Sequence, residues 1–135
     1  MTWVNKTSSE KGEKNINALE GKFNELLIAA IDDELSLLGE LVKNSFYVHL
    51  ENTSGIGKDD IPQQVEEFSK VLHRFFGLDA SRLEIRFLRS LYLKLKVEFE
   101  FPEIDLCEWI ESEFSFAGCI NYMKRNFESC VGLMK

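Results

Sequence analysis

The chain has 135 residues, of which 44% are hydrophobic and eleven are Phe, and its formal net charge is −7. This length suits one domain of common size, and the apolar content supplies a real core, which excludes a wholly disordered chain. No uninterrupted apolar run approaches the roughly 20 residues of a membrane helix, so we expect no membrane segment.

The first 15 residues, MTWVNKTSSEKGEKN, are polar and contain no apolar stretch of the kind that a secretory signal carries. We therefore expect residues 1–15 to form a flexible tail, residues 16–135 to form a single helical domain, and the protein to lie in the cytoplasm.

Apolar residues recur every three or four positions over residues 19–38, which predicts one helix with a single apolar stripe. Gly39 is expected to end it. A second, shorter helix follows and ends near Asn52, with Phe46 on its apolar side and His49 as a hydrogen-bonded histidine at the edge of the core.

Residues 52–62, NTSGIGKDDIP, contain a Gly-Lys pair that raises the question of a phosphate site. A P-loop needs a glycine six residues before that pair and a hydroxyl residue after the lysine, but Glu51 and Asp59 stand in those places. Asp59 and Asp60 would also repel a phosphate. We interpret the stretch as a connector whose Pro62 suits the first turn of a helix.

A third helix is predicted from an apolar stripe that Gly77 closes, namely Val65, Phe68, Leu72, Phe75 and Phe76. A fourth begins near Ala80, and its predicted core residues recur at helical spacing: Phe87, Leu88, Leu91 and Leu95.

The period then changes, because apolar and charged residues alternate strictly in LKLKVEFEF, residues 93–101. Such alternation is typical of a strand, which we predict over residues 95–101 and which Pro102 ends. Two copies paired antiparallel about Val97 would place lysine opposite glutamate along the outer face. We therefore hypothesise a two-fold homodimer through this strand. The proposed dimer residues are Lys94, Leu95, Lys96, Val97, Glu98, Phe99 and Glu100.

An intramolecular hairpin over residues 82–101 is the alternative, because Leu83, Ile85 and Phe87 also alternate with charged residues; it would delete the fourth helix. Beyond Pro102 we expect a short helix over residues 104–110 and a final one over residues 114–127. The predicted fold class is thus mainly α, a compact domain of five to six helices with one short strand, with α+β as the alternative.

Basic residues concentrate in one block, since residues 73–96 carry six basic and two acidic groups in an acidic chain. If this block is helical, Arg82, Arg86 and Arg89 share one face, because they are spaced by four and three residues. They could meet nucleic-acid phosphates, but in an acidic chain they more readily meet its own carboxylates or an acidic partner.

No catalytic motif is recognisable in the chain, and the adjacent Asp32, Asp33 and Glu34 point in different directions on a helix. The three cysteines, Cys107, Cys119 and Cys130, have no zinc-site spacing and are expected to be reduced and buried. We predict no catalytic residue, no cofactor and no metal site, and no enzyme.

The run from Ala29 to Gly77 resembles the archaeal signalling output domain family that is named after Nitrosopumilus, and the resemblance extends over roughly residues 26–125. It rests on the following residues: Ile31, Asp32, Leu38, Gly39, Tyr47, His49, Leu50, Glu51, Ile61, Pro62, Phe68, Leu72, Phe76 and Gly77. Where the family has a Gly-Ala step after Phe-Gly, this chain has Leu78, Asp79 and Ala80. The resemblance implies a helical fold and a role at the output end of signalling through contacts with other proteins.

Three functions follow, in order of preference. The first is a non-catalytic protein-interaction domain in signalling or regulation, which binds a second copy of itself and another protein. The second is a nucleic-acid-associated regulator that uses the arginine face, which we favour less because of the net charge. The third is a small-molecule sensor with an aromatic-lined cavity.

Overall fold

Five α-helices and two short 3-10 helices make up the part of the chain that the structure describes. The structure is a computed structural model, and it describes the backbone of residues 11–99 and 115–133 and the side chains of residues 20–99 and 115–129. The elements are α2 (Lys11–Ser36), α3 (Glu40–Ser54), η1 (Lys58–Gln63), α4 (Val65–Phe76), η2 (Gly77–Asp79), α5 (Ala80–Phe99) and α7 (Phe116–Leu133). The predicted mainly helical fold is confirmed.

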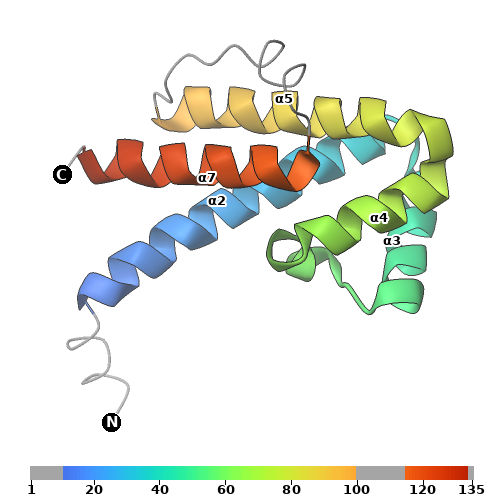
Figure 1. The fold of residues 1–135 in the computed structure, drawn as a ribbon, viewed down its shortest axis with the longest axis horizontal. Helices are drawn as coiled ribbons and strands as arrows, with labels where there is room; N and C mark the ends of the chain where they lie inside the picture. Colours follow the sequence, from blue (N-terminus) through green and yellow to red (C-terminus); the bar gives the residue numbers. More distant parts are fainter. Residues whose placement is uncertain (1–10, 100–114, 134–135) are drawn as a thin grey trace, which may run out of the picture.

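The three longest helices, α2, α5 and α7, pack on one another, and α3 and α4 close one end of the domain (Figure 1). Helices α5 and α7 lie side by side and run in the same direction, whereas α2 crosses them in the opposite sense. Helix α4 reaches both α5 and α7, so the two parts share one hydrophobic core.

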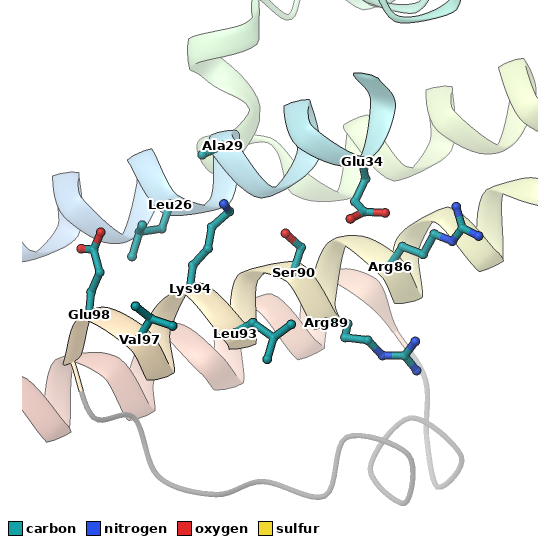
Figure 2. A pocket seen from close by; sticks show the side chains of 10 residues that line it. All are labelled: Leu26, Ala29, Glu34, Arg86, Arg89, Ser90, Leu93, Lys94, Val97 and Glu98. Atoms are coloured by element: carbon teal, nitrogen blue, oxygen red, sulfur yellow. The ribbon is translucent and has the colours of Figure 1, made fainter. Parts of the chain in front are cut away.

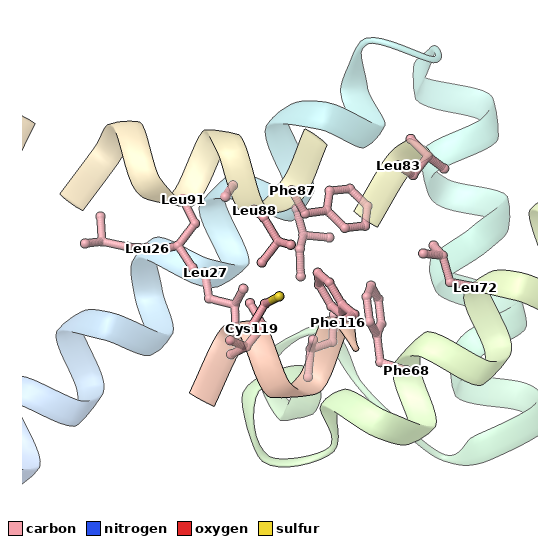
Figure 3. Close-up of a cluster of buried hydrophobic side chains, with 14 of the residues drawn as sticks. Leu26, Leu27, Phe68, Leu72, Leu83, Phe87, Leu88, Leu91, Phe116 and Cys119 are labelled. Carbon is pink, nitrogen blue, oxygen red and sulfur yellow. The ribbon is translucent and has the colours of Figure 1, made fainter. Parts of the chain in front are cut away.

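Three phenylalanines from three helices meet at the centre of this core. Phe68 of α4, Phe87 of α5 and Phe116 of α7 have ring centroids 6.2, 6.2 and 6.1 Å apart. Figure 3 shows them beside the leucines of α2 and α5. All three rings are at least 96% buried, and their spacing suits edge and tilted ring contacts.

A second aromatic cluster joins α3 to α4. The fully buried ring of Phe46 lies 5.8 Å from Phe68, 5.4 Å from Phe75 and 5.5 Å from Phe76, measured between centroids. His49 lies 5.3 Å from Phe75 and is half-buried, in line with the predicted position at the edge of the core. Because Phe68 belongs to both clusters, it connects the aromatic contacts of α3 to those of the main core, while α3 also packs on α2.

Glycines close two of the predicted helices. Gly39, with φ 110°, separates α2 from α3, and Gly77, with φ 61°, follows the last residue of α4. Residues that have a Cβ atom rarely adopt such positive φ values, so glycine is required at both turns. The predicted helix boundaries at Gly39 and Gly77 are confirmed.

The N-terminal boundary differs from the prediction, because α2 begins at Lys11, inside the segment 1–15 that was expected to be a tail. Residues 1–10 lie outside the described residues. The polar composition of residues 11–15 does not prevent a helix, since lysine and glutamate are good helix formers.

The predicted strand is wrong over residues 95–99, which belong to α5, and no strand occurs within residues 11–99 or 115–133. Glu100 and residue 101 lie outside the described part. Of the alternating apolar residues between 93 and 99, only Leu95 is fully buried; Leu93 is 55% and Val97 is 84% exposed. The alternation therefore does not mark one buried face.

Helical spacing prevails here because it continues a buried row that begins earlier in the chain. Leu88, Leu91 and Leu95 follow one another at three and four residues and are fully buried. Phe99 extends the row, and its ring lies 5.0 Å from that of Phe127 of α7. A helix also pairs its own backbone groups, whereas an isolated strand does not.

The alternative hairpin over residues 82–101 is wrong for the same reason, because residues 82–99 form one continuous helix. The predicted short helix over residues 104–110 lies outside the described residues. The predicted final helix is confirmed as α7, which buries Phe116, Cys119, Ile120, Met123 and Phe127.

Replacing Phe87 tests the central aromatic contact. We expect Phe87→Ala to lower the free energy of unfolding by about 3–5 kcal/mol, because it leaves a cavity between α4, α5 and α7. Urea unfolding, followed by circular dichroism, measures this change in the free energy of unfolding. Leu41→Ala, at a side chain that is 81% exposed, is the control and should change the value by less than about 0.5 kcal/mol. Equal effects of the two changes would contradict this role for Phe87.

Candidate partner-binding groove

An open groove with a volume of about 690 Å³ lies between α2 and α5. Leu26 and Ala29 of α2 form one wall, and α5 forms the other. Figure 2 shows Val97 and Glu98 near one end of the groove and Arg86 and Arg89 near the other. Exposed Val97 therefore lies at one end together with the carboxylate of Glu98, and the two arginines lie at the other end, near Glu34 of α2.

One row of side chains along α5 connects the two ends. Arg82, Arg86, Arg89, Leu93 and Val97 are spaced by four, three, four and four residues, which places them on one face of the helix. All five are exposed. The predicted arginine face is thus confirmed as an exposed helical face, and it continues directly into two exposed apolar side chains.

The three arginines of this row differ from most lysines of the domain in their electrostatic partners. None of the three makes an ion pair with a residue that the structure describes, although the chain is acidic. Six lysines do form ion pairs with carboxylates: Lys22, Lys43, Lys58, Lys70, Lys94 and Lys124. The expectation that the arginines meet the chain's own carboxylates therefore fails for the described residues.

The residues proposed for a dimer strand are divided among different faces of α5. Lys94 lies 2.8 Å from Asp33 and Glu98 lies 3.5 Å from Lys22, so both contact α2. The Lys96 ammonium group lies 5.6 Å from the centre of the Tyr92 ring. Leu95 and Phe99 pack toward the core, and Val97, at 84%, is largely exposed.

A buried carboxylate forms a second polar cluster, beside an opening of about 480 Å³ between α4, α5 and α7. Glu84 is 1% exposed, accepts a hydrogen bond from the Ser69 hydroxyl, and lies 3.0 Å from Nε2 of His73. Ser69 and His73 are one helical turn apart on α4, so this cluster joins α4 to α5.

The order of partners in this cluster differs from that of a hydrolytic triad. In a triad the histidine lies between the nucleophile and the acid, and it removes the hydroxyl proton. Here the carboxylate of Glu84 lies between Ser69 and His73, so the histidine does not activate the serine. The prediction that the protein is not an enzyme stays a prediction.

Cys119 is a buried free cysteine, as predicted, and burial raises the pKa of its thiol. Cys107 and Cys130 lie outside the residues whose side chains are described. Among residues with described side chains, no three His, Cys, Asp or Glu groups lie close enough to hold a metal ion. No described helix is both long enough and apolar enough to cross a bilayer.

The connector around Gly57 and Lys58 is held by contacts with the chain's own carboxylates. Lys58 lies 3.0 Å from Asp32 of α2, and the Asp60 carboxylate accepts a hydrogen bond of 3.1 Å from the Gly57 amide. Ile56 and Ile61 are fully buried on either side. The Gly57 amide and the Lys58 ammonium group therefore contact the chain's own carboxylates, and Pro62 lies inside η1 and not in the first turn of α4.

Asp32 also binds α3, since it accepts a hydrogen bond of 3.0 Å from the Tyr47 hydroxyl and lies 3.6 Å from Lys43. Partial burial acts to raise the pKa of Asp32, but the hydrogen bonds from Lys58 and Tyr47 outweigh it and hold the pKa below its ordinary value. Burial, together with the Asp32 carboxylate, raises the pKa of Tyr47.

Compared with family models, with curated proteins and with solved structures, the chain gives no match. Several positions on which the family resemblance rests are core residues here, among them Ile31, Leu50, Ile61, Phe68 and Leu72. Those positions therefore specify packing, and membership of the signalling family stays a prediction.

Sequence reasoning did not find the cluster around Glu84. Ser69 and His73 are four residues apart on the polar side of a predicted helix, but nothing in the sequence connects them to Glu84. It also did not single out Leu93, which the apolar alternation had placed on a buried face.

The Asp32 cluster predicts a pH-dependent contribution to stability. Because the pKa of Asp32 is lower in the folded state, its stabilisation is present above the ordinary pKa of about 3.9 and is lost as the pH falls through the folded value. We expect Asp32→Asn to lower the free energy of unfolding by about 1 kcal/mol at neutral pH.

Urea unfolding between neutral and acidic pH measures this effect. The difference between wild type and Asp32→Asn should shrink below about pH 4. The exposed Asp59, changed to Asn, is the control and should show no comparable difference. A difference that grows with acidification would contradict the assignment.

The Glu84 cluster makes an asymmetric prediction. We expect His73→Ala to lower the free energy of unfolding by about 1–3 kcal/mol, because the buried carboxylate loses a hydrogen-bond partner. Adding Glu84→Gln should recover much of this loss, because it removes the buried charge. Urea unfolding of the single and double variants at neutral pH measures both. Simple addition of the two losses would refute the coupling.

Proposed function

We propose that this domain is a non-catalytic protein-interaction module that binds its partner through the groove between α2 and α5. The observation that carries this proposal is the exposed row on α5, in which three arginines without an ion-pair partner among the described residues continue into exposed Leu93 and Val97. Arginine and apolar side chains together are typical of protein interfaces.

A partner that covers the row on α5 would be stabilised by apolar contact and by hydrogen bonds to the arginines. Burying Leu93 and Val97 removes apolar surface from water, which is favourable. An arginine side chain also supplies apolar length and a planar group that binds carboxylates in pairs of hydrogen bonds. The same row offers no nucleophile or proton-transfer group.

A role in the output or regulation of archaeal signalling is the finer part of the proposal. Its support is the sequence resemblance, which implies function through contacts with other proteins. The groove is compatible with that role, because it presents a ready surface without a catalytic group.

The predicted homodimer now has a different physical basis, since the strand that suggested it is helical. A second copy cannot pair with residues 95–99 as a strand edge, because these residues are helical. The dimer stays a prediction, and sedimentation equilibrium over a concentration series measures it.

A nucleic-acid partner is the second candidate function, and the absence of ion pairs at the three arginines among the described residues is what favours it. Glu34 and Glu98 line the same groove, and the chain carries a net charge of −7, which both oppose phosphate binding. A small-molecule sensor has less support, because none of the residues lining this groove is aromatic.

Site-specific crosslinking tests the proposed function. A purified chain with benzoylphenylalanine in place of Leu93 is added to an extract of its native cells and irradiated. We expect protein adducts at this position, because a bound partner covers it. The matched control carries the crosslinker in place of Val48, which has nearly the same exposure, 58% against 55%, but lies on α3.

Three outcomes decide between the candidates. Adducts at position 93 that nuclease does not remove, with none at position 48, support the interaction module. Nuclease-sensitive adducts at position 93 would assign the groove to nucleic acid. Equal labelling at both positions would refute a specific role for the groove.

A further inference from the structure

We infer that the groove partner is an amphipathic helix with acidic side chains at one end and apolar side chains at the other. This inference rests on the proposed function and names the chemistry of the partner. It follows from the order of side chains along the exposed row on α5, which is basic from Arg82 to Arg89 and apolar at Leu93 and Val97.

The spacing of the row matches that of another helix. At a rise of about 1.5 Å per residue, the three arginines extend over roughly 10 Å, and Val97 lies roughly 12 Å beyond Arg89. A helix laid along α5 presents side chains at the same intervals of three and four residues. An extended peptide, whose side chains alternate at a period of two, does not match this row over the same length.

Charge determines the acidic end of the partner. Arg86 and Arg89 line the groove, and Arg82 extends the row by one turn of α5. These guanidinium groups have no carboxylate partner among the described residues, so carboxylates from outside can bind them without displacing one of those residues. The lysine in the groove is different, because Lys94 already contacts Asp33 at 2.8 Å.

Apolar contact determines the other end. Leu93 and Val97 of α5 line the same groove as Leu26 and Ala29 of α2, and the Lys94 side chain extends between the two helices (Figure 2). Two apolar side chains one helical turn apart would cover Leu93 and Val97 and fill the space beside Ala29. This end supplies affinity, and the arginine end supplies orientation.

A designed helical peptide tests this inference. The peptide repeats the spacing of the row, with three glutamates that match the three arginines and two leucines that match Leu93 and Val97. A second peptide has the same residues in the reverse order along its sequence. The control peptide carries glutamine in place of each glutamate. Binding of the labelled peptides to the full chain is followed by fluorescence anisotropy at low and high salt.

We expect one of the two glutamate peptides to bind, and the glutamine peptide to bind about tenfold more weakly. Arg86→Glu should weaken binding of the glutamate peptide by about tenfold, and added salt should weaken it as well. Arg125→Glu, at an exposed arginine of α7, is the matched control and should leave binding unchanged.

Charge exchange provides the most specific check. A peptide with lysines in place of the glutamates should bind the double variant Arg86→Glu and Arg89→Glu better than it binds wild type. Both substituted side chains are exposed, and an unchanged unfolding midpoint verifies that the variant folds.

Four outcomes would overturn the inference. The first two are no binding by either glutamate peptide and equal binding of the glutamine peptide. The third is a wild-type dimer that Arg86→Glu breaks, which would assign the groove to a second copy. The fourth is tighter binding of the glutamate peptide to a chain with Glu103→Gln, Asp105→Asn and Glu108→Gln, which would assign the groove to the chain's own acidic residues 103–108. Crosslinking at position 93 without probe binding would overturn the inference and leave the proposed function standing.

Discussion

The contact of Phe68, Phe87 and Phe116 is the constraint on which the arrangement of the domain depends. It joins α4, α5 and α7, which come from three separate parts of the chain, and Phe68 also meets the Phe46 cluster of α3. Once Phe87 points into this core, helical geometry places the residues of its own stripe beside α2 and α7. The arginine row must then face outward, so the same packing that stabilises the domain also creates the exposed face.

Two polar clusters stabilise the edges of this core. Asp32 connects α2 to α3 and to η1 through Tyr47 and Lys58, and Glu84 connects α5 to α4 through Ser69 and His73. Both carboxylates have the hydrogen-bond donors that a buried or partly buried charge requires. In both clusters a carboxylate joins neighbouring helices, whereas Arg82, Arg86 and Arg89 of α5 form no ion pair with a described residue.

The helices and much of the core could be predicted from the sequence, because their signals are local. Gly39 and Gly77 mark turns that need a positive φ, and the stripe of Phe116, Cys119, Ile120, Met123 and Phe127 is apolar at helical spacing whatever surrounds it. The strand prediction was wrong because Leu93 and Val97 fit the two-residue period of a strand and the spacing of a helix equally well. Only the burial of Leu95 and Phe99 against other helices decides between those periods, and that burial depends on residues far away in the chain.

By itself the sequence determined a helical domain, its turns, and a helical face that carries Arg82, Arg86 and Arg89, because each of these follows from residues a few positions apart. Tertiary structure decided that α5 continues through residues 95–99, that Lys94 and Glu98 are paired with α2, and that Leu93 and Val97 extend the arginine row. Those features depend on which helix lies beside α5. Pairing and exposure are properties of the packed chain, so a pattern along one segment does not contain them.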